Sequence, residues 1–219
     1  VTVMLPPSER PFWDPVARQL HMINDPEAHK PMSRFNDGAV DRRGRFWAGT
    51  LGDTYNNALY RLDPNGAVSC MQTGVDISNG IGWSPDNRMM YFTDSTPAII
   101  YAYDFDIDTG TIANRRVLVD SSHRPGVPDG LTVDQQGFIW SARWGGACIE
   151  RYDPTGKLER TIAVPARYPT SVAFGGDDLR DLYITSARAG LSAEERQAAT
   201  MNGDLFLVRL DVGGLHGGV

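Results

Sequence analysis

Residues 34–50 read Arg-Phe-Asn-Asp-Gly-Ala-Val-Asp-Arg-Arg-Gly-Arg-Phe-Trp-Ala-Gly-Thr, and this stretch decides the fold. A polar residue near a glycine opens a short apolar run, an Asp-x-x-Gly turn follows, and an aromatic-rich run comes after the turn. Short runs of β-branched and aromatic residues between Asp, Gly and Pro turns are typical of β-strands. The stretch therefore predicts two short strands joined by a tight turn.

The same order of features returns three more times along the chain. Asn36, Asn79, Asp129 and Thr170 mark the same place in the four copies, and the first three lie 43 and 50 positions apart. Repeats of that length are typical of propeller blades with four strands each. The sequence therefore predicts an all-β chain that folds as a β-propeller of four-stranded antiparallel blades, in one domain over residues 1–219.

Composition narrows the classes of partner. The net charge of −6 and the sequence pI near 5.2, with no run of Lys or Arg, argue against a nucleic-acid partner. No apolar run approaches the roughly 20 residues that cross a bilayer, so we expect no membrane partner. Cys70 and Cys148 lie in apolar runs of different repeats and predict buried free thiols. A reducing cytoplasm fits this pattern, with a processed secreted protein as the alternative, and we expect a monomer or weak homodimer.

The N-terminal part departs from the repeat. Residues 9–24 have the strand, turn and strand of a blade, but its third and fourth strands are missing, and residues 25–33 have the Pro and polar composition of a connection. We expect the ring to close with five blades, residues 11–24 completing one of them together with C-terminal strands. An open ring and an edge covered by a partner chain are the alternatives. Residues 192–199 carry a Ser-x-x-Glu capping box and predict a short surface helix.

Four segments resemble a known family. Arg34–Gly38, Ser78–Ile81, Pro128–Leu131 and Tyr183–Arg188 closely resemble, in order and spacing, the signature segments of the SMP-30/gluconolactonase/regucalcin-like family. The resemblance covers almost all of residues 34–215 and is weaker before residue 34.

This resemblance implies a six-bladed propeller with one divalent metal ion at the mouth of the central channel. By matching position it implies Glu9, Asn79 and Asp129 as metal ligands, with Arg34 and Asn36 contacting the substrate. The implied reaction is the hydrolysis of sugar-acid lactones such as gluconolactone. Calcium is the ion we expect, with zinc, manganese or magnesium as alternatives.

The residues themselves support part of this assignment. Asn79 and Asp129 occupy equivalent places in different repeats, and such residues converge on the axis of a propeller. Their side chains offer oxygen donors that suit hard or borderline cations, and Asp129 could also accept a proton as the general base. The alternative is that both are ordinary turn residues, that Glu9 is a solvated side chain, and that Asp37 braces the turn.

Other hydrolytic chemistries lack the residues they need. The four histidines show no pairing typical of a zinc site, and the chain has no Gly-x-Ser-x-Gly elbow. We expect most tryptophans to pack between blades and one to line a sugar pocket. Two functions remain as alternatives to a lactonase: a non-catalytic calcium-binding propeller of the regucalcin type, and a truncated scaffold without activity.

Overall fold

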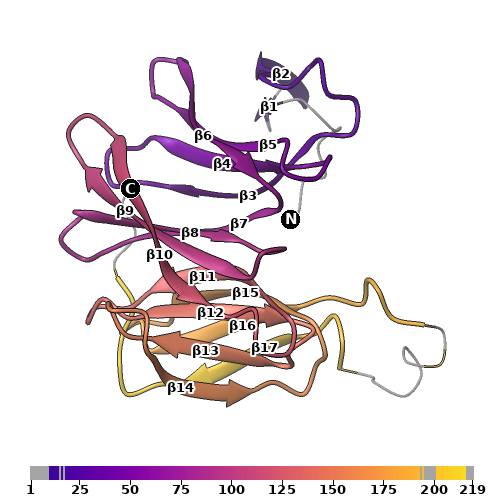
Figure 1. Cartoon of the computed structure of the whole chain (residues 1–219), viewed down its shortest axis with the longest axis vertical. Coiled ribbons are helices and arrows are strands. Elements are labelled where there is room, and N and C mark those ends of the chain that lie inside the picture. Colours follow the sequence, from indigo (N-terminus) through magenta and orange to yellow (C-terminus); the bar gives the residue numbers. More distant parts are fainter. Residues whose placement is uncertain (1–9, 15, 17, 193, 195–200, 216–219) are drawn as a thin grey trace.

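The computed structural model describes residues 10–14, 16, 18–192, 194 and 201–215. Fifteen strands form four antiparallel sheets in chain order (Figure 1). The first blade contains β3 (Arg34–Val40), β4 (Phe46–Leu51), β5 (Asn57–Leu62) and β6 (Val68–Val75), and the second contains β7 (Ser78–Trp83), β8 (Met89–Asp94), β9 (Ile99–Asp106) and β10 (Thr111–Asp120). The third contains β11 (Val127–Val133), β12 (Ile139–Trp144), β13 (Cys148–Tyr152) and β14 (Leu158–Ala163), and the fourth contains β15 (Pro169–Gly175), β16 (Asp181–Ser186) and β17 (Leu205–Arg209).

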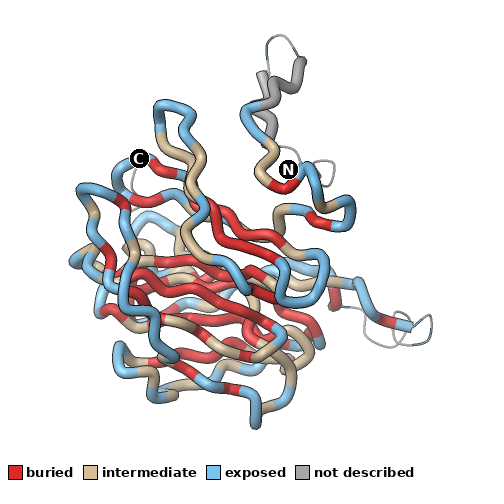
Figure 2. The backbone as a smooth tube through the Cα atoms, turned by 45° about the horizontal axis from the view of Figure 1, so that its top comes forward, coloured by how far each residue is buried: buried red, intermediate tan, exposed pale blue. Residues whose placement is uncertain are grey.

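The arrangement is that of a β-propeller. The first strands of successive blades are neighbours: β7 contacts β3 and β11, and β11 contacts β15. Figure 2 shows the buried residues concentrated in the stacked blades and the exposed residues in the connecting loops. The predicted fold class is therefore confirmed, and its repeat unit is the four-stranded blade, although the fourth blade has three strands among the described residues.

The core consists of three apolar clusters, and each one joins two neighbouring blades. Trp47 of β4 packs edge-on against Trp83 of β7 and Phe105 of β9, at ring distances of 6.2 and 6.0 Å. Trp140 of β12 packs in the same way against Phe174 of β15, at 6.1 Å. These tryptophans lie between blades, as predicted, so each blade is stabilised by the apolar face of the next.

The Asp-x-x-Gly turns have a structural role in this core. Asp41 is buried, and its Oδ2 accepts hydrogen bonds from Trp47 Nε1 (2.9 Å) and Arg45 Nε (2.7 Å). In the third blade Asp134 Oδ2 accepts from Trp140 Nε1 (2.9 Å) and Arg151 Nη2 (2.6 Å). Each carboxylate also accepts backbone N–H groups of its own turn. The repeated aspartate thus ties the turn to the tryptophan between the blades.

The N-terminal hairpin corrects one prediction. β1 (Arg10–Asp14) pairs only with β2 (Gln19–Asn24), and this two-stranded sheet is separate from the sheet of β15, β16 and β17. Figure 1 places the hairpin beside the first blade, at the other end of the molecule from β17. The predicted five-bladed closure through this segment is therefore wrong for the described residues, because the short connection from β2 leads directly onto the first blade.

That connection is fixed by a buried carboxylate. Glu27 is 2% exposed and accepts hydrogen bonds from Tyr60 Oη of β5 (3.0 Å), Lys30 Nζ (2.9 Å) and Ser33 Oγ. Burial is the largest single influence and acts to raise the pKa of Glu27, but the three hydrogen bonds together lower it. Residues 25–33 are thus held against the first blade through Glu27 and Tyr60.

Three further predictions from the sequence concern the cysteines, the helix at residues 192–199 and membrane-spanning segments. Cys70 and Cys148 are free thiols as predicted, but Cys70 is exposed and Cys148 half-buried, so the predicted burial is wrong. Cys70 lies on β6, which is the edge strand of the first blade and is mostly half-buried or exposed. Most of the predicted helix at residues 192–199 lies outside the described residues. Among the residues that are described, no helix has the length and apolarity needed to cross a membrane.

Candidate active site at one mouth of the channel

The inner strand of every blade is irregular at the same point. Antiparallel register shifts between Phe35 and Gly38 in β3, between Ser78 and Ile81 in β7, between Pro128 and Leu131 in β11, and between Pro169 and Ser171 in β15. The four residues that mark the repeat, Asn36, Asn79, Asp129 and Thr170, lie within these irregularities. A bulge in a strand redirects a side chain. The repeat therefore brings four polar side chains to one end of the channel.

Glycines next to the bulges allow the inner strands to approach closely. A Cβ atom placed on Gly80 would lie 2.4 Å from the backbone nitrogen of Leu131, and one on Gly130 would lie 2.4 Å from Ser171 Oγ. Any other residue at these positions would push neighbouring blades apart. The glycines that accompany Asn79 and Asp129 thus set the spacing of the site.

The polar residues line a cavity of about 680 Å³. Its volume is within the range of small-molecule sites, roughly 300–1,000 Å³. The cavity is lined by Asn36, Asp37, Leu51, Ile77, Asn79, Ser95, Val127, Asp129, Trp144, Thr170 and Ser171. Trp144 stacks on Tyr168, with ring centroids 4.6 Å apart, and is the tryptophan expected at a sugar pocket. The wall therefore combines an aromatic ring and the aliphatic side chains of Leu51, Ile77 and Val127 with a few hydrogen-bonding groups.

A chain of hydrogen bonds orients the amides. Arg34 Nη1 donates to Asn36 Oδ1 (3.1 Å), and Asn36 Nδ2 donates to Asn79 Oδ1 (3.0 Å) and to the carbonyl of Ser78 (2.8 Å). Asn79 Nδ2 donates to Ser95 Oγ (2.7 Å), which in turn donates to the carbonyl of Pro128 (2.7 Å). Asn79 is only 9% exposed, so its amide is fixed with Oδ1 toward Asn36.

Asp37 and Asp129 place two carboxylates in the same cavity. Burial, and next the negative charge of Asp37, raise the pKa of Asp129 to about 7, although the backbone N–H of Gly130 acts to lower it. Burial also raises the pKa of Asp37, against a hydrogen bond of 2.8 Å from the N–H of Gly38. Neither carboxylate forms a salt bridge with a described residue. The cavity therefore holds negative charge that no described cation neutralises.

These donors fit a divalent cation. Two carboxylates and the amide oxygen of Asn79 are the oxygen ligands that calcium and similar ions use, and the uncompensated charge favours a bound cation. The described residues contain no group of three His, Cys, Asp or Glu side chains arranged around one point. The candidate ligands among the described residues are thus the carboxylates of Asp37 and Asp129 and the amide of Asn79, and Glu9 lies outside the described residues.

The predicted site residues do not all lie in the cavity wall. The structure brings Asn36, Asn79 and Asp129 together in the cavity wall. Arg34 is exposed and does not line the cavity, but it contacts the site through Asn36. Asp37 braces its bulge through Gly38, as the alternative reading expected, and its side chain also lines the cavity.

Ser95 was not predicted from the sequence as a site residue, and no role in the cavity wall was predicted for Thr170 or Ser171. Ser95 immediately follows β8, and it reaches the site only because Asn79 donates to it across the blade. No local pattern marks it. Thr170 could have been found, because it occupies the fourth copy of the position held by Asn36, Asn79 and Asp129.

Arg143 anchors the segment that leads into Asp129. This guanidinium is 1% exposed and donates to the carbonyls of Gly126 (2.8 Å), Pro125 (3.0 Å), Arg124 (3.3 Å) and Ser121 (3.4 Å). Its remaining donor, Nη1, pairs with Glu150 Oε2 at 3.1 Å. One side chain thus binds four carbonyls within residues 121–126, directly before β11.

Fold and cavity together define a β-propeller with a cavity lined by carboxylate and amide side chains at the bulges of its inner strands. A family described as the SMP-30/Gluconolactonase/LRE-like region matches residues 7–188, and the chain belongs to this family. The resemblance seen in the sequence is therefore confirmed, and the match includes the N-terminal hairpin.

Several known proteins are similar to this chain. Pentonolactonase XacC of Haloferax volcanii is 43% identical over 183 residues, which are 82% of this chain and 63% of that protein. Regucalcin of Danio rerio is 42% identical over 189 residues, covering 84% of this chain and 64% of regucalcin. The chain thus spans less than two thirds of either relative.

A solved structure supports the fold. The calcium-binding protein regucalcin from Agrobacterium tumefaciens superposes with a TM-score of 0.88 at 31% identity. The superposition covers 94% of this chain and 71% of that one. The shared part is the run of blades that carries the cavity.

Proposed function

We propose that this chain hydrolyses lactones of sugar acids with the help of one divalent cation. The observation that carries the proposal is the cavity in which Asp37 and Asp129 have no cationic partner among the described residues and lie beside the fixed amide of Asn79. The pentonolactonase among its relatives supports a lactone as the substrate.

Asn79 and Asp129 would hold the cation, with Glu9 as the third ligand. When bound, a divalent cation polarises a lactone carbonyl and lowers the pKa of a water molecule. Calcium is the first candidate, because a related structure is that of a calcium-binding protein. Zinc, manganese and magnesium remain alternatives for the same oxygen donors.

The other residues would bind and orient the substrate. Arg34 and Asn36 would contact the hydroxyl groups and ring oxygen of the lactone, and Trp144 would cover one face of the sugar. Asp129 would accept the proton of the attacking water, since one carboxylate can contact both a cation and a water. The free thiols at Cys70 and Cys148 favour a reducing compartment such as the cytoplasm.

A panel of aldonolactones, assayed with and without chelator, tests the proposal. We expect turnover above the spontaneous rate that chelator removes and added cation restores. Asp129→Asn should abolish it, and Asp104→Asn, which changes an exposed carboxylate outside the cavity, should not. Absence of turnover in every cation would contradict the proposal.

A second function has one observation in its favour. Calcium binding without catalysis, as in the regucalcin type, fits the likeness to a calcium-binding protein. It predicts cation binding in the same cavity with no lactone turned over, so the same panel, combined with a calcium titration, separates the two. A truncated scaffold would show neither property.

A further inference from the structure

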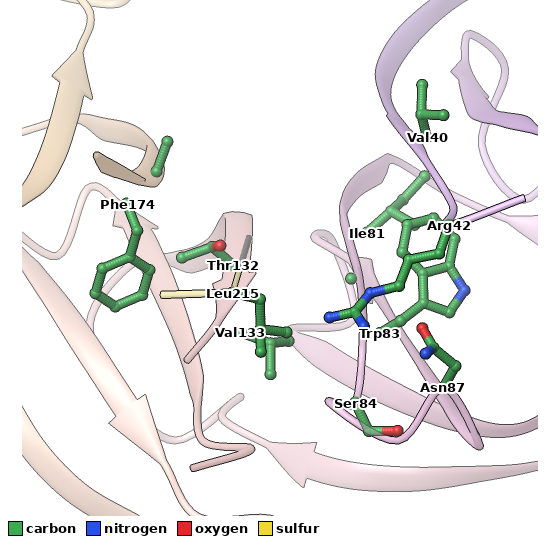
Figure 3. A pocket seen from close by; sticks show the side chains of 12 residues that line it. Val40, Arg42, Ile81, Trp83, Ser84, Asn87, Thr132, Val133, Phe174 and Leu215 are labelled. Atoms are coloured by element: carbon green, nitrogen blue, oxygen red, sulfur yellow. The ribbon is translucent and has the colours of Figure 1, made fainter. Parts of the chain in front are cut away.

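The other end of the channel contains a second cavity, of about 250 Å³. Four residues after Asn36, Asn79, Asp129 and Thr170, each inner strand carries an apolar side chain. These four, Val40, Trp83, Val133 and Phe174, all line the second cavity (Figure 3). It shares no lining residue with the cavity at the acidic mouth.

The apolar floor is fixed by the end of the chain that the structure describes. The backbone N–H of Gln135 donates to the carbonyl of Gly213 (2.9 Å), and the N–H of Gly214 donates to the carbonyl of Leu179 (2.8 Å). A Cβ on Gly214 would lie 2.3 Å from Phe174 Cβ, so a glycine is required for the chain to pass there. These contacts place Leu215 in the cavity wall.

One cation faces this apolar space without a partner. Among the described residues Arg42, in the turn after β3, forms no salt bridge, whereas its neighbours Arg43 and Arg45 pair with Asp108 and Asp41. Its side chain extends past Trp83 toward Val133, and the amide of Asn87 lies on the Trp83 side of the cavity (Figure 3). No Asp or Glu lines the cavity.

We propose that this cavity binds a small monocarboxylate with an apolar body. Its carboxylate would pair with Arg42, whose planar fork matches two carboxylate oxygens, and would accept a hydrogen bond from the Asn87 amide. Its body would lie among Val133, Phe174 and Trp83. At about 30 Å³ per water-sized group, the cavity holds roughly eight such groups, which is close to the nine non-hydrogen atoms of benzoate.

This site is distinct from a product site of the proposed lactonase. Sugar acids carry hydroxyl groups along their whole length, and the apolar wall formed by Val133, Phe174 and Leu215 offers those groups no partners. The second cavity therefore discriminates between carboxylates by the polarity of the body, and gluconate serves as the contrasting ligand.

Titration of the full chain with benzoate, followed by calorimetry and ligand-observed NMR, tests the proposal. We expect a dissociation constant of about 0.1–1 mM, as ligands of this size reach in small pockets. Benzamide, which has the same shape but no charge, should bind at least about tenfold more weakly, and gluconate should not compete.

Arg42→Met should weaken benzoate binding by about tenfold or more, since it removes a charged pair and keeps the apolar stem. The matched control is Arg43→Met in the same turn, which lies outside the cavity and should bind as the wild type does. The proposal would be overturned if the two variants bound benzoate equally, or if the wild type bound benzoate and benzamide equally. It would also be overturned if no benzoate bound at a concentration about tenfold above the expected dissociation constant.

Discussion

Replacing Arg143 with methionine should weaken the fold at the segment that positions Asp129. The guanidinium is 1% exposed and donates to four carbonyls and to Glu150, which is equally buried. Removing one partner of a buried ion pair costs about 3–5 kcal/mol. Glu150 keeps Arg124 Nε at 2.6 Å and the hydroxyl of Tyr152, so the lower end of that range applies. We expect a loss of about 3 kcal/mol in the free energy of unfolding.

Urea unfolding followed by tryptophan fluorescence measures this loss, as a shift of the midpoint at constant slope. The control is Arg116→Met, whose salt bridge with Asp104 is about half-exposed and should contribute about 0–1 kcal/mol. Amide exchange of residues 121–126 should accelerate in Arg143→Met before global unfolding. Equal stability of the two variants would refute the anchoring role of Arg143.

Three further predictions concern the acidic cavity. Asp129→Ala should remove lactone turnover more completely than any other single change. Asp129→Asn should keep an oxygen donor and weak cation binding but lose catalysis. Full activity of Asp129→Asn would exclude the role of Asp129 as general base. Arg34→Ala should lower kcat/KM by an amount that corresponds to about 1.5–3 kcal/mol of lost transition-state stabilisation, and it should leave cation affinity unchanged. A cation affinity, measured by calorimetry, that falls as much as kcat/KM would contradict this. Cation affinity should fall by roughly tenfold per pH unit below about 7, because protons compete for Asp129, whose pKa is raised to about 7. Asp37→Asn should move that inflection to lower pH by removing the neighbouring charge, and an unchanged pH profile would refute the coupling.

The repeat made most of the fold predictable. Strands such as Met89–Asp94 and Cys148–Tyr152 are found where the alternation of apolar runs and Asp/Gly turns predicts them. The closure of the ring could not be predicted in this way, because it depends on where the chain goes after Asn24. The buried Glu27 and its contact with Tyr60 decide that path, and no repeat contains either interaction.

The site was predictable where it follows the repeat. Asn36, Asn79 and Asp129 were found because one bulge recurs in successive inner strands. Ser95 lies outside that pattern, and it joins the site through a hydrogen bond from Asn79, which is distant from it in the sequence of the same blade. The exposure of Cys70 was predicted wrongly for a related reason, since an apolar run does not reveal which strand is the outer edge of a blade.

The most direct test of the central claim is the initial rate of gluconolactone hydrolysis by the chelator-treated chain as calcium is returned. Rates are corrected for spontaneous ring opening and plotted against calcium ions bound per chain. If Asn79 and Asp129 hold the cation, activity should rise from the spontaneous rate and saturate at one calcium ion per chain. Asp129→Ala should show no recovery. Full activity in the chelator-treated chain, or saturation that Asp129→Ala leaves unchanged, would contradict the claim.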